Sequence, residues 1–447
     1  MKLTDALLER WAETLAQKGD SPAIFDTRGE LVRTFRQIEK HATAHEKFSA
    51  NKPRYTVSAI QAGNHMDWPS LFLACLRAQH VALPIDESVS PQQIKAAVSV
   101  SAKSATADWG DKPPVLFKLT SGTTSEPRMI RFRSEQLLAD CDQICETMGI
   151  SDVDLNFGVI PISHSYGFSN LLTPLIARGV PMVLSRDRTP RAVLNDLART
   201  SATVFPGTPV FYQAFCEMKN VPTLSKLRLC ISAGAPLPLT VAKKFRERFG
   251  LSIHSFYGAS ECGGICYDRE AKLEIEGFVG APMNDVYLEF IDPSAESSQV
   301  RVRSAATGDG YFPEADEEKL GDGIFVPDDL LAREGDGFKI VGRVSDVINV
   351  AGKKVSPAEI EATLLRFAGV RQAIAFGRPA AAGALRNEEV TACVVGDAHV
   401  TETELLDFCR RELSSWQVPK RIFVVNKIPT NERGKTSRKE LAKRFSA

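Results

Sequence analysis

The sequence predicts an α/β protein with a large N-terminal domain and a small α+β C-terminal lid domain. Apolar runs alternate with helical stretches along most of the chain, which favours stacked, mostly parallel sheets with helices. Residues 270–345 differ, because short alternating strands there are separated by Gly- and Asp-rich turns. They predict a small β-rich subdomain within the N-terminal domain.

The N-terminal domain is expected to contain six apolar strands with helices between them. The strand-like runs are 57–60, 81–85, 157–160, 180–184, 202–205 and 227–231. The helical patterns are 68–78, 190–200 and 239–249. Shorter strands at 286–291, 300–302 and 338–341 belong to the β-rich subdomain.

The domain boundary is expected after Val344, which gives domains 1–344 and 345–447. The second domain has a compact α+β pattern of two helices and three strands. These are helix 357–367, strands 372–376 and 390–395, helix 401–413 and strand 421–425. Pro357 suits the first position of its helix, with Ser356 as the cap.

Composition excludes several classes of protein. The chain has 447 residues, 43% of them hydrophobic, which is too long for one ordinary domain and apolar enough for sizeable cores. Its 55 basic and 55 acidic residues balance, so no overall charge attracts nucleic acid or an anionic membrane. The nine cysteines lack metal-ligand spacing and are expected to be buried free thiols in a reducing cytosol.

The N-terminal twenty residues predict a helix rather than a signal peptide. Leu7, Trp11 and Leu15 can share a face, but Glu9 and Glu13 interrupt the apolar character. No stretch approaches the roughly 18 uninterrupted apolar residues of a membrane span. We therefore expect a cytoplasmic protein without a membrane span.

The most informative motif is LTSGTTSEPR, residues 119–128. Its small and hydroxyl residues let backbone N–H groups approach a phosphate and donate further hydrogen bonds. It is not the P-loop G-x-x-x-x-G-K-[ST], because the lysine and the second glycine are missing. Taken alone, the run fits either a solvated loop or linker or a phosphate-binding loop. In the second case the residues that would contact phosphate are Thr120, Ser121, Gly122, Thr123, Thr124 and Arg128.

Further segments follow this loop in an order and spacing that resemble the acyl-adenylate-forming enzymes, AMP-dependent synthetases and ligases. That superfamily includes acyl-CoA synthetases, adenylation domains of peptide synthetases and beetle luciferases. The segments are 161–168 (PISHSYGF), 232–237 (SAGAPL), 256–261 (FYGASE), 323–361 and 429–438. The resemblance runs from about Ser21 to about Leu441.

The resemblance implies how ATP would be bound. The adenine would lie against Ala233, Gly234, Ala235, Tyr257 and Gly258, and Ser260 would meet the α-phosphate. Glu261 would hold Mg²⁺, since carboxylate oxygens are natural Mg²⁺ ligands beside substrate phosphates.

The resemblance also implies roles for the end of the chain. Counting back from Arg343, itself a cation near the nucleotide, places Asp329 at the ribose, and Asp328 stays an alternative. Ser345 would be the hinge, and Gly352 would line the thiol tunnel. Lys435 would stabilise the adenylation transition state, where negative charge builds on the α-phosphate.

The acid substrate is predicted only as a class. The resemblance places His164 at the mouth of the acyl pocket and among the candidate catalytic residues. Candidate pocket walls are Tyr166, Phe168, Phe205, Phe211, Cys262 and Gly263, a mix that suits an aryl or medium-chain acid. Peptide-synthetase domains for α-amino acids carry an aspartate in this segment, and none lies between Pro161 and Asn170, so the resemblance argues against an α-amino acid.

The expected reaction converts a small carboxylic acid and ATP into acyl-AMP and pyrophosphate, and then transfers the acyl group to a thiol. We favour CoA, because the chain has no fused carrier domain; the phosphopantetheine of an acyl carrier protein is the alternative. A non-catalytic ligand-binding member of the fold is a remote alternative, against which Glu261, Arg343 and Lys435 argue. A monomer and a homodimer both stay open, as does the effect of the shortened segment 99–118.

Overall fold

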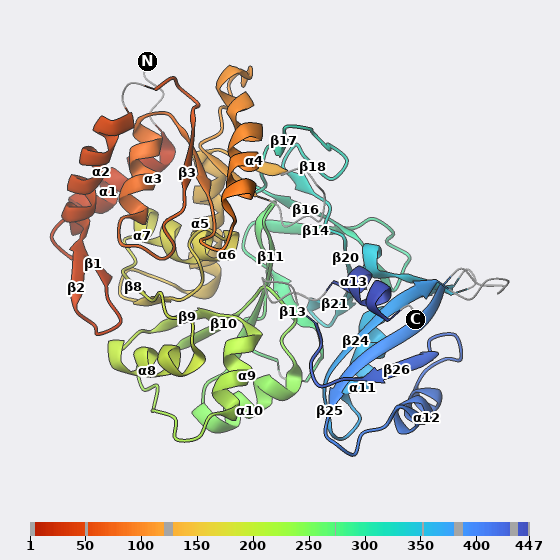
Figure 1. The fold of residues 1–447 in the computed structure, drawn as a ribbon. Coiled ribbons are helices and arrows are strands. Elements are labelled where there is room, and N and C mark those ends of the chain that lie inside the picture. The colour runs from red at the N-terminus through yellow and green to blue at the C-terminus, as the bar shows by residue number, and fades with distance from the viewer. Residues whose placement is uncertain are drawn as a thin grey trace. The chain divides into compact units, whose positions relative to one another are not determined.

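The computed structural model of the chain describes residues 5–49, 52–119, 128–272, 274–350, 353–379, 388–429 and 437–445. The chain divides into two compact units (Figure 1). The first holds 1–289, 301–327 and 334–338, and the second holds 290–300, 328–333 and 339–447. The predicted α/β class is confirmed. The boundary after Val344 stays a prediction, and the second unit also takes in two earlier segments.

The largest sheet of the first unit is parallel in its centre. Its strand order there is β13-β12-β11-β10-β9-β7-β8-β1-β2. Neighbours from β1 to β11 are parallel, whereas β2, β12 and β13 are attached antiparallel. The bounds are β1 Pro22–Phe25, β2 Leu31–Thr34, β7 Asn156–Gly158, β8 Met182–Leu184, β9 Val204–Gly207, β10 Leu229–Ser232, β11 Ile253–Ala259, β12 Gly263–Tyr267 and β13 Phe278–Pro282.

The second sheet of the first unit has the order β17-β6-β5-β4-β3. Strands β3, β4 and β5 are parallel, and β6 and β17 extend the sheet antiparallel. The bounds are β3 Val57–Ile60, β4 Val81–Pro84, β5 Leu116–Leu119, β6 Met129–Phe132 and β17 Gly310–Phe312. A smaller sheet comprises β14 Val286–Phe290, β16 Val300–Ser304, β19 Ile324–Phe325 and β18 Leu320–Gly321, and β19 is antiparallel to both β16 and β18.

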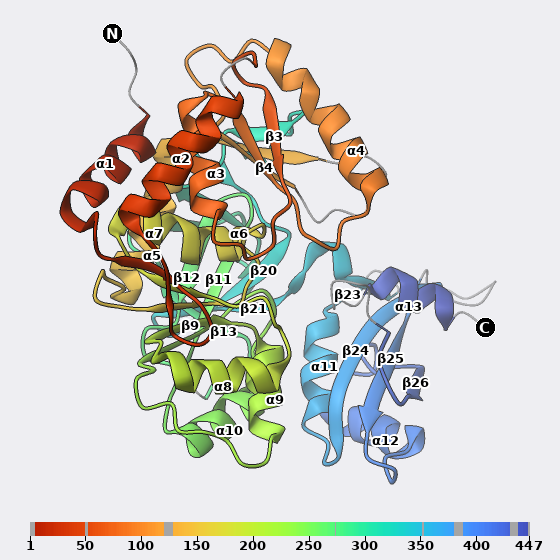
Figure 2. The same cartoon turned by 60° about the vertical axis from the view of Figure 1, so that its left-hand side comes forward.

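Helices cover both sheets of this unit. Helices α8 (Pro190–Thr200), α9 (Pro209–Glu217) and α10 (Leu239–Phe249) lie beside β9, β10 and β11 (Figure 1). Helix α3 (Trp68–Arg77) lies by β4 and α4 (Pro91–Ser101) by β3, and α2 (Phe35–Ser49) packs on α3 (Figure 2). The others are α1 Ala6–Lys18, α5 Ser134–Met148, α6 Ser165–Gly167 and α7 Thr173–Arg178, with the short turns η1 Ala102–Thr106 and η2 Phe168–Leu172.

The second unit contains the predicted C-terminal α+β pattern. Its three-stranded sheet has the order β24-β25-β26, with α11 and α13 against β24 and α12 against β26. The bounds are α11 Pro357–Leu365, β24 Val370–Pro379, β25 Glu388–Gly396, α12 Glu402–Glu412, β26 Arg421–Val424 and α13 Arg438–Arg444. Before them come β15 Ser297–Ser298, β20 Asp329–Glu334, β21 Gly337–Arg343, η3 Val344–Asp346, β22 Ile348–Val350 and β23 Lys353–Val355.

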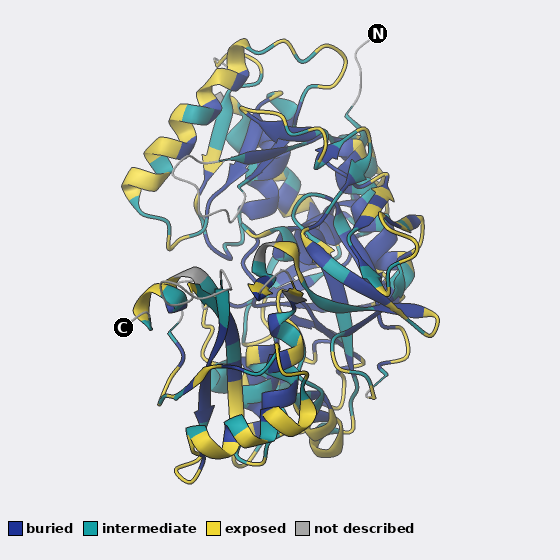
Figure 3. Cartoon of the chain, turned by 90° about the vertical axis from the view of Figure 1, so that its right-hand side faces the viewer, coloured by how far each residue is buried: buried dark blue, intermediate teal, exposed yellow. Residues whose placement is uncertain are grey.

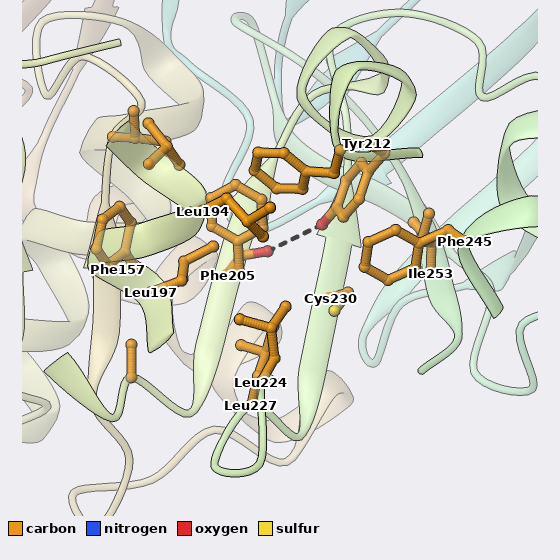
Figure 4. Close-up of a cluster of buried hydrophobic side chains, with 14 of the residues drawn as sticks. Phe157, Leu194, Leu197, Phe205, Tyr212, Leu224, Leu227, Cys230, Phe245 and Ile253 are labelled. Atoms are coloured by element: carbon orange, nitrogen blue, oxygen red, sulfur yellow. Dashed lines mark hydrogen bonds between the residues drawn. The ribbon is translucent and has the colours of Figure 1, made fainter. Parts of the chain in front are cut away.

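Aromatic rings fill the core between the central strands and helices α8 to α10 (Figure 4). Phe205 lies among the rings of Phe157, Tyr212 and Phe215, and the Tyr212 hydroxyl donates to the carbonyls of Phe205 and Ile231 at 3.2 and 2.9 Å. The strands are mostly buried, and the outward faces of the helices are exposed (Figure 3).

Three finer expectations can be compared with the structure. All nine cysteines are free and buried, as expected. Ser356 occupies the cap position of α11, but its hydroxyl donates to the Val341 carbonyl instead of capping the helix. Among the helices in the described ranges, none has the length and apolarity to cross a membrane.

Candidate functional site

The turn between β11 and β12 carries Ser260 and Glu261, and the two strands approach each other very closely there. A Cβ on Gly258 would lie 2.6 Å from the Gly263 carbonyl oxygen, so only glycine fits. Gly263 has φ +71°, and Asp140 Oδ1 would lie 2.0 Å from a Cβ on it. Asp140, from α5, also accepts a hydrogen bond from the Gly264 N–H at 3.1 Å. This packing fixes where the turn points.

Glu261 is held by the segment around β17. The Tyr311 hydroxyl donates to Glu261 Oε1 at 3.1 Å, and the Gly308 N–H donates to the Glu261 carbonyl at 2.8 Å. Burial, followed by the charge of Glu261, raises the pKa of Tyr311 well above its usual range, so the phenol is a neutral donor. The Arg128 guanidinium carbon lies 3.7 Å from the centre of the Tyr311 ring.

The segment 161–168 lies beside this turn. The Ser165 and Ser260 hydroxyl oxygens are 3.0 Å apart, which joins the segment directly to the residue predicted to meet the α-phosphate. Tyr166 packs its ring 5.9 Å from that of Phe256, and its hydroxyl donates to the Ile231 carbonyl. Burial raises the pKa of Tyr166, so it is neutral at physiological pH.

His164 is half exposed and faces a carboxylate that the sequence analysis did not single out. Its Nε2 lies 3.2 Å from Asp86 Oδ2, at the end of β4. Asp86 also accepts from the Ser88 N–H at 3.0 Å and its hydroxyl at 2.6 Å. Burial alone would raise the pKa of Asp86, but the Ser88 hydrogen bonds and the charge of His164 lower it overall.

The predicted adenine turn follows β10. The Ala233 N–H donates to the Gly207 carbonyl at 3.3 Å, while Gly234 and Ala235 are exposed. Gly234 has φ +84° with open space where a Cβ would lie. Tyr257, on the neighbouring strand, is buried. The turn therefore presents bare backbone, which suits a flat ring.

In the second unit, Asp329, predicted at the ribose, forms an ion pair with Arg343, predicted as a cation near the nucleotide. Arg343 Nε donates to Asp329 Oδ1 at 2.7 Å. Asp329 is buried, whereas Asp328 is exposed. Successive side chains of this segment point in different directions, so one carboxylate is buried and the other is exposed. The sequence alone could not show which of the two is buried.

The predicted pocket walls divide into two groups. Phe168 and Phe205 are fully buried, and Phe168 contacts Phe72 edge-on at 5.2 Å. Tyr166 and Phe211 are only partly buried and lie at the margin of the aromatic core. Cys262 is buried, and burial raises the pKa of its thiol, so it stays protonated. The role of all these residues as acyl contacts stays a prediction.

Several predicted residues cannot be placed. Thr120, Ser121, Gly122, Thr123, Thr124, Gly352 and Lys435 lie outside the described residues. The backbone of Ser345 forms part of η3. Their predicted roles are therefore unchanged by the structure.

Lys118 is a further residue that sequence reasoning missed. It lies on β5, directly before the phosphate loop, and its ammonium is 4.4 Å from the centre of the Phe132 ring. Burial lowers its pKa, opposed by the charges of Asp140 and Glu261. A single charge inside the apolar run LFKL was the available signal. No comparable local signal marked Tyr311 or Asp86 as partners of Glu261 and His164.

The donor set at Glu261 fits Mg²⁺ better than a metal held by protein ligands alone. In the parts of the chain that the structure describes, no group of three or more potential metal ligands occurs. Mg²⁺ is commonly bound through one or two carboxylates together with substrate phosphates and water. A single carboxylate beside the residue predicted to meet the α-phosphate therefore suits this ion.

Two family models match the chain. The one described as AMP-binding enzyme matches residues 106–312, and the one described as AMP-binding enzyme C-terminal domain matches 359–435. The 3,4-dihydroxybenzoate–aryl-carrier protein ligase of Bacillus anthracis is 30% identical over 332 residues, which cover 73% of this chain and 73% of that ligase. This chain belongs to the AMP-binding enzyme family.

Other relatives of this AMP-binding enzyme agree with that assignment. The "probable CoA ligase CCL9" of Humulus lupulus is 29% identical over 350 residues, covering 74% of this chain but only 66% of that ligase. The crystal structure of ATP-bound MatB from Rhodopseudomonas palustris matches with a TM-score of 0.84 over 98% of both chains at 23% identity, which confirms the fold. The chain is accordingly an AMP-forming acid–thiol ligase, as the sequence predicted.

Proposed function

We propose that this AMP-binding enzyme activates an aryl or medium-chain carboxylic acid with ATP and transfers the acyl group to CoA. The observation that carries the proposal is the Ser165–Ser260 contact of 3.0 Å. It brings the segment predicted to gate the acid beside the turn predicted to hold the α-phosphate and the metal. The two reactants of an adenylation would then meet at one place in the first unit.

In the first step, a carboxylate oxygen of the acid attacks the α-phosphorus of ATP. The bond from that phosphorus to the oxygen bridging to the β-phosphorus breaks, which gives acyl-AMP and pyrophosphate. The protein contributes position and charge stabilisation rather than a covalent intermediate. Ser260 and Lys435 would act at the α-phosphate, and Thr120 to Thr124 with Arg128 would hold the leaving phosphates.

The metal and the nucleoside have separate proposed contacts. Glu261 would hold Mg²⁺, which neutralises phosphate charge when it is bound. Asp329 and Arg343 would bind the ribose side, and the burial of Asp329 and its ion pair support it over Asp328. Ala233, Gly234, Ala235 and the ring of Tyr257 would hold the adenine.

In the second step, the thiol sulfur attacks the acyl carbonyl carbon, and the carbon–oxygen bond to AMP breaks. The products are a thioester and AMP, and the thiol proton passes to solvent. We propose that the C-terminal domain turns about Ser345 between the steps, removing Lys435 and bringing in the Gly352 face. Using two faces of one small domain separates the half-reactions in time.

The acceptor has two candidates. CoA is our first candidate, because the Humulus lupulus relative is named a probable CoA ligase. The Bacillus anthracis relative carries the name of an aryl-carrier protein ligase, which favours a carrier phosphopantetheine as the second. That same name contains 3,4-dihydroxybenzoate, which supports an aryl acid.

The experiment is an acid panel with product analysis. Purified enzyme is incubated with MgATP, one acid from an aryl and alkyl series, and either CoA or a phosphopantetheinylated carrier protein. The proposal predicts that AMP and pyrophosphate form with the cognate acid and that a CoA thioester appears by mass spectrometry. If a thioester forms only on the carrier protein, the carrier phosphopantetheine is the acceptor instead of CoA. ATP binding without products for any acid would indicate the non-catalytic alternative.

A further inference from the structure

Tyr311 connects two parts of the proposed phosphate site that are far apart in the sequence. It lies on β17, where it pairs with Ile130 of β6. Its side chain is 4% exposed, and its hydroxyl donates to Glu261 Oε1 at 3.1 Å. The backbone just before it is fixed to the same residue, because the Gly308 N–H donates to the Glu261 carbonyl at 2.8 Å. Glu261 is thus held at its carbonyl and at its carboxylate by one short segment.

The Tyr311 ring also contacts Arg128, the residue directly before β6. The Arg128 guanidinium carbon lies 3.7 Å from the ring centre. Its guanidinium is also 3.3 Å from Asp316. A planar guanidinium stacks on an aromatic face, which a lysine ammonium cannot do in the same way. The Arg128 guanidinium therefore has an aromatic partner.

Asp309 anchors β17 against β6 beside this pair. It accepts from Arg133 Nε at 2.7 Å and from Gln136 Nε2 at 2.8 Å, and its carbonyl accepts from Arg131 at 2.9 Å. Because these bonds tie Asp309 to β6 and the residues after it, the adjoining strand β17 has little freedom to move. Tyr311 is consequently held in place, with its hydroxyl bonded to Glu261 and its ring stacked with Arg128.

We propose that Tyr311 is a positioning residue for the metal-binding carboxylate and that the stacked Arg128 guanidinium clamps its ring in place. This rests on the proposed function, because it takes Glu261 as the Mg²⁺ ligand. The Tyr311 hydroxyl restricts the Glu261 carboxylate to one orientation before the metal arrives. The enzyme then binds Mg²⁺ with nucleotide more tightly than a freely rotating carboxylate would allow.

The test measures Mg²⁺ binding rather than turnover. Wild type and Tyr311→Phe are mixed with α,β-methylene-ATP, which resists adenylation, and Mg²⁺ is titrated while the melting temperature is recorded. Phenylalanine keeps the ring and the stacking and removes only the hydroxyl. The Mg²⁺ concentration at half-maximal thermal shift should rise about tenfold, as expected for loss of one hydrogen bond to a charged group.

Tyr212→Phe is the matched control, because Tyr212 is also buried and its hydroxyl also donates, but to backbone carbonyls in the aromatic core. It should lower the melting temperature and leave the Mg²⁺ midpoint unchanged. Arg128→Lys, at a partly exposed site, should fold and should raise the midpoint less than Tyr311→Phe does. If Tyr311→Phe fails to fold, an unchanged midpoint in Arg128→Lys overturns the proposed clamp.

The failure of this inference can be told from failure of the proposed function. If Tyr311→Phe has the same Mg²⁺ midpoint as wild type, the positioning role of Tyr311 is overturned, while the proposed adenylation still stands. A wild type without any Mg²⁺-dependent shift, together with no acid-dependent pyrophosphate release, overturns the proposed function itself. A raised midpoint in Tyr311→Phe but not in Tyr212→Phe supports the inference.

Discussion

His164 Nε2 lies 3.2 Å from Oδ2 of Asp86, so the residue predicted at the mouth of the acyl pocket has its ring orientation tied to the end of β4. Ser163, the preceding residue, donates to the same carboxylate oxygen at 3.4 Å. The pKa of Asp86 is lowered overall, so the carboxylate is an anion at neutral pH. A charged acceptor of this kind makes a stronger hydrogen bond than a neutral one.

Asp86→Asn should therefore weaken recognition of the acid more than it slows adenylation. Loss of the anion lets the half-exposed imidazole rotate, so KM for the acid should rise roughly threefold to tenfold with kcat little changed. Initial rates of pyrophosphate release over a range of acid concentrations measure both constants. Glu87→Gln is the control, because the exposed Glu87 pairs only with Arg186 among the contacts observed, at 3.0 Å. An unchanged KM in Asp86→Asn would show that the pair does not orient the gate.

Asp329→Asn should raise KM for ATP and leave KM for the acid unchanged. The variant removes the charge that pairs with Arg343 and replaces one of the two carboxylate oxygens proposed to accept from the ribose hydroxyls with an NH₂ donor. A rise of about tenfold is expected for the loss of a charged hydrogen-bond acceptor. Asp328→Asn is the matched control at the exposed neighbour. The opposite result, with the effect in Asp328→Asn alone, would move the ribose role to Asp328.

Lys435→Ala and Ser345→Pro should separate the two half-reactions. The first should nearly abolish acid-dependent pyrophosphate release and leave thioester formation from preformed acyl-AMP largely intact, because the lysine serves only adenylation. The second should spare adenylation and block thiolation, because proline restricts the hinge. Lys427→Ala, at an exposed position of the same domain, is the control. Equal loss of both half-reactions in Lys435→Ala would contradict its assigned role.

Asp154 should make the first unit sensitive to acid. Its carboxylate is 3% exposed and accepts from Arg228 at 2.7 and 2.6 Å. Burial alone would raise its pKa, but the hydrogen bonds from Arg228, the Ser151 N–H and Thr203 lower it overall. The stabilisation is therefore complete above the ordinary pKa of an aspartate and disappears as pH falls through the lowered value.

Asp154→Asn should accordingly destabilise the fold by about 3 kcal/mol at pH 7, with a smaller difference from wild type at low pH. Urea unfolding at several pH values measures this difference. Asp152→Asn is the control, since the exposed Asp152 pairs with Lys18 at 2.6 Å on the surface. A difference that does not shrink toward low pH would show that the charge of Asp154 is not the cause.

Periodic patterns predicted the framework of this fold well. The runs 57–60, 190–200 and 239–249 match β3, α8 and α10 at both ends, because each run is apolar on the side that packs. The run predicted at 202–205 was displaced, and β9 spans Val204–Gly207. Strand ends depend on which neighbour supplies hydrogen bonds, and the N–H groups of Thr203 and Val204 both donate to Leu155.

Pairings between distant residues were not predictable in the same way. Tyr311 and Glu261 are 50 positions apart, and their contact depends on where β17 joins the second sheet. Asp86 and His164 likewise meet only because β4 ends beside the segment before α6. The motifs predict which residues bind the nucleotide, and the packing shows which residues contact them.

Acyl-adenylate formation at Ser260 and Glu261 is tested most directly by exchange of labelled pyrophosphate into ATP, because exchange requires reversible adenylation and no thiol. We expect exchange that depends on both a cognate acid and Mg²⁺, continues without CoA, and is lost in Glu261→Ala. Exchange that persists undiminished in Glu261→Ala, or its absence for every acid while ATP still binds, would contradict adenylation at this turn.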